Sequence, residues 1–188
     1  MQLQAPIYSL AELTPLRAAW RSAGLKVVLT NGVFDLLHVG HISYLMAARA
    51  LGDRLIVAIN SDESTRLLKG PLRPIVPAAE RAAIIAALRC VDAVTIFTER
   101  TAETVVAALT PDLYVKGGDY SQGATIDETR LPEARVARMV GSEVQLLPFY
   151  EGYATTQLIE RIVARYGGMI PAGRAYAHNE DQPQPSGA

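Results

Sequence analysis

Along the chain, short runs of β-branched and other apolar residues alternate with longer stretches in which apolar residues recur every three or four positions. The short runs predict β-strands and the longer stretches predict amphipathic helices. This alternation is typical of a parallel sheet, because parallel strands need long crossover connections that are usually helical. The pattern therefore predicts an α/β fold with a five-stranded parallel sheet and helices on both faces. Its strands are expected at residues 27–30, 55–60, 93–97, 113–116 and 143–146.

Helical periodicity predicts the remaining elements. Helices are expected at residues 10–23, 41–51, 78–87, 101–109, 131–139 and 155–166. From Gly167 onward the sequence is rich in Gly, Pro, Gln, Ser and Ala and has no periodicity, a composition that buries too little apolar surface to fold. The sequence therefore predicts one domain over residues 1–166, followed by a flexible tail over 167–188 without a catalytic role.

Composition narrows the class of partner. The 188 residues include 18 Lys or Arg and 19 Asp or Glu, which gives a formal net charge of −1, and no basic cluster is present. Nucleic acids and anionic membrane surfaces require a concentrated basic footprint, so neither is predicted as a partner. The single cysteine, Cys90, excludes an internal disulfide, and no signal peptide or membrane-spanning apolar stretch is visible. These features predict a cytoplasmic protein that acts on small molecules.

The most informative segment, residues 30–41, runs from the end of the first strand into a helix. In open α/β sheets the carboxyl ends of the strands form the ligand crevice, and a helix N-terminus there attracts phosphate. Gly32 would let the backbone approach a ligand closely, and Gly40 would leave space between His38 and His41. The spacing therefore predicts two imidazoles beside an anion site.

Two histidines beside a phosphate suit phosphoryl or nucleotidyl transfer. They can donate hydrogen bonds to oxygens whose negative charge grows during the reaction, and the ordinary pKa of histidine lies near neutrality. The alternative for either histidine alone is a capping or core residue. A metal site is disfavoured, because no third ligand of suitable type lies nearby in the sequence.

The tetrapeptide at residues 38–41, His-Val-Gly-His, resembles the HxGH signature of the nucleotidyltransferase superfamily. Further motifs agree with it, and together they resemble the adenylyltransferase domain of ADP-heptose synthases, without the sugar-kinase domain of the bifunctional members. The resemblance spans residues 27–166. These motifs are Asn-Ser-Asp at 60–62, Lys-Gly-Pro-Leu-Arg-Pro at 69–74, Glu-Arg at 80–81 and Val-Lys-Gly-Gly-Asp-Tyr at 115–120.

The resemblance implies a Rossmann-like nucleotidyltransferase fold and a definite reaction. AMP would pass from ATP to D-glycero-β-D-manno-heptose 1-phosphate, giving ADP-heptose and pyrophosphate by direct in-line attack. Mg²⁺ is expected to accompany ATP, although the sequence shows no dedicated carboxylate cage for it. The resemblance also implies a homodimer.

The resemblance further implies roles for individual residues. Catalytic roles are expected for His38, His41 and Lys69. Nucleotide contacts are expected for Asn31, Gly32, Val33, Phe34, Gly40, Lys116, Gly118, Asp119, Thr155 and Thr156. Contacts with the acceptor substrate are expected for Asp35, Arg73 and Arg81.

Some of these residues have alternative interpretations. Asp35 could hold its loop instead of touching substrate, and Arg81 could pair with an acid such as Glu80 or Asp92. Lys116 could face the triphosphate or solvent. Residues 117–119 fit either a nucleoside pocket, with the carboxylate accepting from a ribose hydroxyl, or a plain tight turn.

The start of the last predicted helix departs from the family pattern. The family usually has a glycine followed two residues later by Ser-Thr-Thr, whereas this chain has Ala154 in place of the serine. Thr155 and Thr156 are expected to bind phosphate and to cap the helix. The missing hydroxyl weakens the expected contacts with the triphosphate.

Two other functions compete with this hypothesis. A cytidylyltransferase acting on glycerol 3-phosphate or phosphoethanolamine would share the fold and the phosphate chemistry, but the motifs at 69–74 and 115–120 favour the heptose group. A nucleotide-binding protein without catalysis is the second alternative. The presence of His38, His41 and Lys69 argues against it, while Ala154 supports it.

Overall fold

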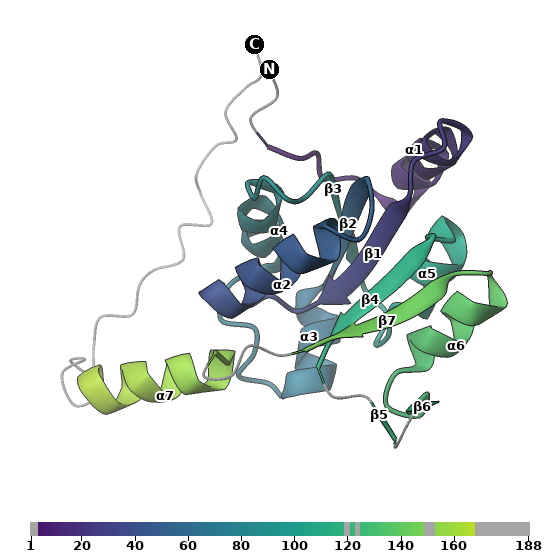
Figure 1. Ribbon diagram of the computed structural model, residues 1–188. Coiled ribbons are helices and arrows are strands. Elements are labelled where there is room, and N and C mark those ends of the chain that lie inside the picture. The colour runs from purple at the N-terminus through teal and green to yellow at the C-terminus, as the bar shows by residue number, and fades with distance from the viewer. Residues whose placement is uncertain (1–3, 119–120, 123–124, 149–152, 168–188) are drawn as a thin grey trace, which may run out of the picture.

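The computed structural model describes residues 4–118, 121–122, 125–148 and 153–167. Five strands form one parallel sheet in the order β3-β2-β1-β4-β7 (Figure 1). They are β1 (Val27–Gly32), β2 (Arg54–Asn60), β3 (Ala93–Phe97), β4 (Leu113–Gly117) and β7 (Glu143–Leu147). All five strands were predicted, and the α/β fold class is confirmed.

Helices cover both faces of the sheet (Figure 1). On one face, α1 (Leu10–Ser22), α5 (Glu103–Leu109) and α6 (Pro132–Met139) pack on side chains such as Leu29 and Ile56. On the other face, α2 (Val39–Arg49) and α4 (Ala78–Ala86) pack on neighbouring side chains such as Val28 and Val57. Adjacent strand residues thus face opposite sides of the sheet, which is why β1 and β2 carry continuous apolar runs, Val27–Leu29 and Leu55–Ile59.

The sequence did not predict α3 (Asp62–Lys69). Its start is nevertheless well specified, because the Ser61 side chain accepts a hydrogen bond from the Ser64 amide and two acids occupy the first turn. Lys69 is the last residue of this helix. A two-stranded antiparallel pair, β5 (Ser121–Gln122) with β6 (Thr125–Ile126), was also not predicted.

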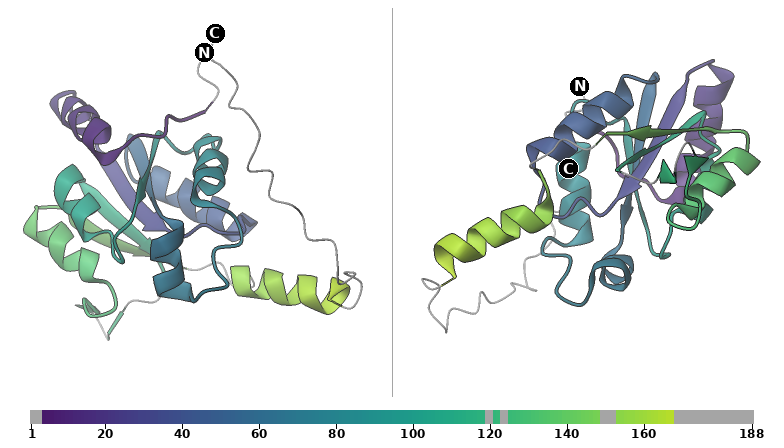
Figure 2. Two further views of the ribbon diagram at one scale, coloured as in Figure 1. Left: turned by 180° about the vertical axis from the view of Figure 1, so that it is seen from behind. Right: turned by 60° about the horizontal axis from the view of Figure 1, so that its bottom comes forward.

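The last helix, α7 (Thr155–Tyr166), stands apart from the layered body (Figure 2). None of its residues is buried, and Ile162, Val163 and Tyr166 are exposed. Apart from Gly167, the predicted tail lies outside the described residues. No described helix is both long enough and apolar enough to cross a lipid bilayer.

Candidate functional site

A cavity of about 490 Å³ opens at the carboxyl edge of the sheet. Its wall includes the ends of β1 and β4, the first turns of α2, α6 and α7, and the last turn of α3. Predicted site residues that line it are Asn31, Gly32, Val33, Phe34, Asp35, His38, Gly40, His41, Lys69, Arg73, Lys116, Thr155 and Thr156. Gly118 and Arg81 are not among the lining residues, and Asp119 lies outside the described residues.

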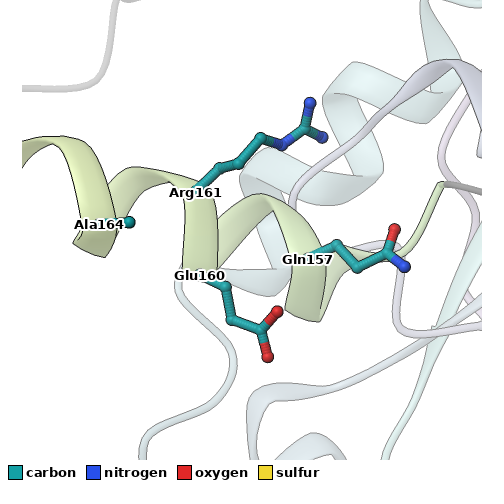
Figure 3. A pocket seen from close by; sticks show the side chains of 4 residues that line it. All are labelled: Gln157, Glu160, Arg161 and Ala164. Atoms are coloured by element: carbon teal, nitrogen blue, oxygen red, sulfur yellow. The ribbon is translucent and has the colours of Figure 1, made fainter.

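A second hollow of about 480 Å³ runs along α7 and is lined by Gln157, Glu160, Arg161 and Ala164. These side chains belong to the one helix, and those of Glu160 and Arg161 point away from each other (Figure 3). Because its polar groups do not converge on a common point, this hollow is a surface groove and not a candidate site.

His38 and His41 form a stacked pair at the start of α2. Their ring centroids are 3.8 Å apart with an interplanar angle of 22°, and the Phe34 ring meets His41 edge-on at 5.4 Å. A Cβ on Gly40 would lie 3.1 Å from His38 Nδ1 and 2.8 Å from Tyr153 Cβ. Glycine is therefore required for this close packing. Both histidine Nδ1 atoms are buried without a hydrogen-bond partner among the described residues, and both histidines line the cavity.

Burial sets the charge of this pair. It lowers the pKa of His41 to about 4, assisted by repulsion from His38, and it also lowers the pKa of His38. His41 is therefore neutral at pH 7 in the free protein. A bound polyphosphate would raise both pKa values, because a nearby negative charge favours the imidazolium form.

The free energy of unfolding should decrease as the pH falls from about 6.5 to about 4. In this range an exposed histidine binds a proton whereas His41 in the folded protein does not, so the unfolded chain binds more protons. At 1.36 kcal/mol per pKa unit, His41 contributes a loss of at most about 3 kcal/mol in the free energy of unfolding. Urea unfolding of wild type and His41→Gln near neutral pH and near pH 4.5 would measure it. The acid-induced loss should be smaller in the variant, and an equal loss would contradict the lowered pKa.

The first turns of α2 and α7 differ electrostatically from those of the other helices. In the described chain, α1, α3, α4, α5 and α6 each carry an acid in the first turn, but α2 and α7 carry none and have no side-chain cap. Both line the same cavity. Because the first amides of a helix lack intrahelical partners and carry partial positive charge, these two helix starts give this part of the cavity a positive potential that suits an anion.

The predicted capping role of Thr155 and Thr156 is wrong. The N-cap of α7 is Ala154, and no side chain caps the helix. The position where the family usually has serine is therefore the N-cap itself. The two threonines lie in the first turn and line the cavity, which is compatible with their predicted contact with phosphate.

Ala154→Ser should slow hydrogen exchange of the α7 amides about fivefold, because a serine N-cap stabilises a helix by about 1 kcal/mol relative to alanine. Hydrogen-exchange mass spectrometry is the suitable measurement, since α7 buries no residue and opens locally. Ala164→Ser makes the same substitution inside the helix and should give no slowing. Equal exchange in wild type and Ala154→Ser would contradict the assignment of the N-cap.

Asp35 holds the segment that follows α3. Its carboxylate accepts hydrogen bonds from the amides of Ile75 and Val76 and from Arg73 Nε, the last at 2.5 Å. Burial alone would raise the pKa of Asp35, but the amides of Val76 and Ile75 and the Arg73 guanidinium hold it below its ordinary value. The carboxylate therefore supports the loop, and Arg73 is the member of this ion pair that remains partly exposed in the cavity wall.

The position of Arg81 corrects the predicted contact of this residue with the acceptor substrate. Its side chain is 0% exposed and donates hydrogen bonds to Val33 O, Val76 O and Asp62 Oδ1. It binds neither Glu80 nor Asp92, and it does not reach the cavity. Three segments around the site are joined by this one guanidinium, so its role is structural.

Lys116 lines the cavity and is partly exposed. Its ammonium donates to Asn31 O at 3.1 Å and to Asn31 Oδ1 at 2.9 Å, and burial lowers its pKa to about 8. A Cβ on Gly32 would meet the Phe34 ring at 2.9 Å, so the packing of this ring also requires glycine. Gly32 itself lines the cavity, and its contact with a nucleotide stays a prediction.

Several cavity residues were missed by the sequence analysis. They are Tyr44, Arg100, Thr101, Arg130 and Glu133. Tyr44 exchanges a hydrogen bond with Thr30 at 2.6 Å and donates to Val115 O, and its ring lies against Gly117. Of these five residues, only Arg100 and Thr101 could have been found from the sequence. They follow a predicted strand and are therefore expected near the ligand-binding edge of the sheet.

A family model described as cytidylyltransferase-like matches residues 29–161. Similar curated proteins include the bifunctional protein HldE of Koribacter versatilis, 49% identical over 158 residues, and that of Klebsiella pneumoniae, 47% identical over 156 residues. These alignments cover 84% and 83% of this chain but 31% of each relative. The chain thus spans about a third of the length of the relatives it matches.

Two solved structures share the fold. The lipopolysaccharide core biosynthesis protein from Thermoplasma volcanium is 33% identical with a TM-score of 0.54, and the match covers 70% of this chain and 100% of that one. A pantoate-beta-alanine ligase from Francisella tularensis is 14% identical with a TM-score of 0.50, covering 77% of this chain and 67% of that one. At that identity the second likeness shows the fold alone.

Proposed function

Because the chain belongs to the cytidylyltransferase-like family, we propose that it transfers AMP from ATP to D-glycero-β-D-manno-heptose 1-phosphate, giving ADP-heptose and pyrophosphate. One observation carries the proposal. The two helix N-termini without acids meet the stacked histidine pair in a single cavity, a combination that suits a polyphosphate. The match to bifunctional HldE proteins and the motifs at 69–74 and 115–120 support the choice of sugar.

In this reaction an oxygen of the sugar phosphate attacks the α-phosphorus of ATP, and the bond from that phosphorus to the pyrophosphate oxygen breaks. Such a step depends on positioning and charge stabilisation and needs no covalent intermediate. His38 and His41 donate hydrogen bonds to the α- and β-phosphate oxygens as negative charge moves onto the leaving pyrophosphate. The amides at the starts of α2 and α7 and the threonine hydroxyls hold the rest of the triphosphate.

Cationic side chains complete the phosphate site. Lys69 lies exposed at the end of α3 in the cavity wall, where its flexible side chain can follow the leaving pyrophosphate. Among the described residues, no group of three His, Cys, Asp or Glu side chains is placed to hold a metal. We therefore assign Mg²⁺ to the triphosphate oxygens, where it would neutralise part of their charge when bound.

Pyrophosphate release by the purified protein with Mg²⁺ tests the proposal. ATP and CTP would each be offered with heptose 1-phosphate, glycerol 3-phosphate and phosphoethanolamine. Release with ATP and heptose 1-phosphate only is the expected result. Release with CTP and an alcohol phosphate would retain the phosphate chemistry but overturn the substrate, and binding of ATP without release in any pair would favour a non-catalytic protein.

The homodimer implied by the resemblance and the cytoplasmic location predicted from the composition both stay predictions. Light scattering coupled to size-exclusion chromatography would determine the oligomeric state directly.

A further inference from the structure

The half of α2 that carries the histidines is not held by fully buried apolar side chains. The buried residues of this helix, Leu45 and Ala48, both lie in its second half. Its start receives no side-chain cap from the described residues, and neither His38 Nδ1 nor His41 Nδ1 makes a hydrogen bond with them. Besides the edge-on contact of His41 with Phe34, a different kind of contact must therefore fix the imidazoles relative to the sheet.

Tyr44 makes such a contact from the middle of α2. It lies three residues after His41, so the two side chains project from neighbouring positions on the helix surface. Its hydroxyl lies 2.6 Å from Thr30 Oγ1 in β1 and 3.1 Å from Val115 O in β4. A Cβ on Gly117 would lie 3.0 Å from Tyr44 Cε2, so the ring also rests against the end of β4. One side chain thus ties α2 to two adjacent strands of the sheet.

The chemistry of the two partners fixes the direction of both hydrogen bonds. A carbonyl oxygen can only accept, so the Tyr44 hydroxyl donates its proton to Val115 O. Thr30 Oγ1 is then the donor in the shorter contact with Tyr44. Thr30 is buried, and it is the register partner of Val115 where β1 pairs with β4. The relay from Thr30 through Tyr44 to Val115 therefore bridges two paired strands and sets the position of α2 above them.

The relay lies where small displacements affect the proposed transfer. Tyr44 lines the same cavity as His38 and His41. A misplacement of about 1 Å in a group that acts on the reacting atoms can reduce a rate about 100-fold. Because the imidazoles act on charge that develops during the reaction, a shift of α2 on the sheet would weaken stabilisation of the transition state more than binding of the substrates.

We propose that Tyr44 is a positioning residue for the nucleotidyl transfer, and that its hydroxyl relay with Thr30 and Val115 O holds the first half of α2 so that His38 and His41 face the reacting phosphates. Tyr44 acts through the two histidines and needs no contact with either substrate. The inference therefore does not depend on which substrate occupies which end of the cavity. It rests on the proposed function, because it assigns the histidines to a phosphate-transfer step.

Tyr44→Phe tests the relay, because phenylalanine keeps the ring against Gly117 and removes only the hydroxyl. We expect kcat for pyrophosphate release to fall about 10- to 100-fold, with KM for ATP changed by less than about threefold. Tyr8→Phe is the matched control, because Tyr8 packs on the opposite face of the sheet from α2. It should leave both constants unchanged. A wild-type kcat in Tyr44→Phe would overturn the proposal.

A double variant separates positioning from stability. In Tyr44→Phe the buried Thr30 hydroxyl loses its acceptor, which should lower the melting temperature. Adding Thr30→Val removes this unsatisfied hydroxyl with little change in shape, so the double variant should regain part of the lost melting temperature while kcat stays low. Recovery of kcat together with the melting temperature would reduce Tyr44 to a stabilising residue and contradict the proposal.

Nuclear magnetic resonance of the imidazole protons tests the relay without turnover. The chain has three histidines, and the stacked rings of His38 and His41, 3.8 Å apart, shift each other's proton resonances. In Tyr44→Phe these resonances should move, whereas that of His178, in the predicted tail, should not. Unmoved resonances would overturn the proposal whatever the enzymatic activity. Moved resonances in a protein that releases no pyrophosphate with any tested pair would support the relay and contradict the proposed function instead.

Discussion

Replacing His38 or His41 by alanine is expected to lower kcat for pyrophosphate release by about 100-fold or more. Removing one donor from an oxyanion site costs about 3 kcal/mol of transition-state stabilisation, which corresponds to that factor. The stacked rings lie in the same part of the cavity wall, so both imidazoles would act on the same phosphate charge. The double variant should therefore lose less than the sum of the two single losses in activation free energy.

Thermal unfolding separates this effect from a loss of structure, because neither imidazole Nδ1 makes a hydrogen bond to the described residues. Each variant should unfold within about 1 kcal/mol of wild type. His178→Ala, in the predicted tail, is the matched control and should retain full activity. Wild-type kcat in both His38→Ala and His41→Ala would remove the histidines from the reaction.

The strands could be predicted because a parallel sheet buried on both faces requires continuous apolar runs. The same reasoning failed for α3. Its apolar residues Leu67 and Leu68 are exposed, whereas its buried residues, Ser64 and Thr65, are polar. A helix whose buried side is polar gives no hydrophobic pattern to read.

The site was predictable where its residues are close in sequence and was missed where the fold brings them together. His38, Gly40 and His41 share one turn, so their spacing indicated their geometry. Glu133 was missed because its position depends on the packing of α6 against α5, which no local pattern contains. A first turn without acids indicates a helix start that suits an anion. For α2 and α7 this can be read from the sequence once the helix starts are known.

Arg81→Ala is expected to lower the free energy of unfolding by about 3–5 kcal/mol, because it removes a buried charge that is paired and hydrogen-bonded. The guanidinium joins the chain after β1, the start of α3 and the segment before α4 through Val33, Asp62 and Val76. Lysine cannot reproduce this planar fork, so Arg81→Lys should recover only part of the loss. Urea unfolding would measure both variants.

The kinetics of the folded fraction distinguish this structural role from the substrate contact that the sequence predicted. Arg138→Ala removes an exposed partner of Glu128 and should cost no more than about 1 kcal/mol, which provides the matched control. If Arg81 holds the loops, Arg81→Lys at low temperature should raise KM for both substrates together or for neither. A selective rise in KM for the sugar phosphate, with wild-type stability, would return Arg81 to the substrate site and contradict its burial.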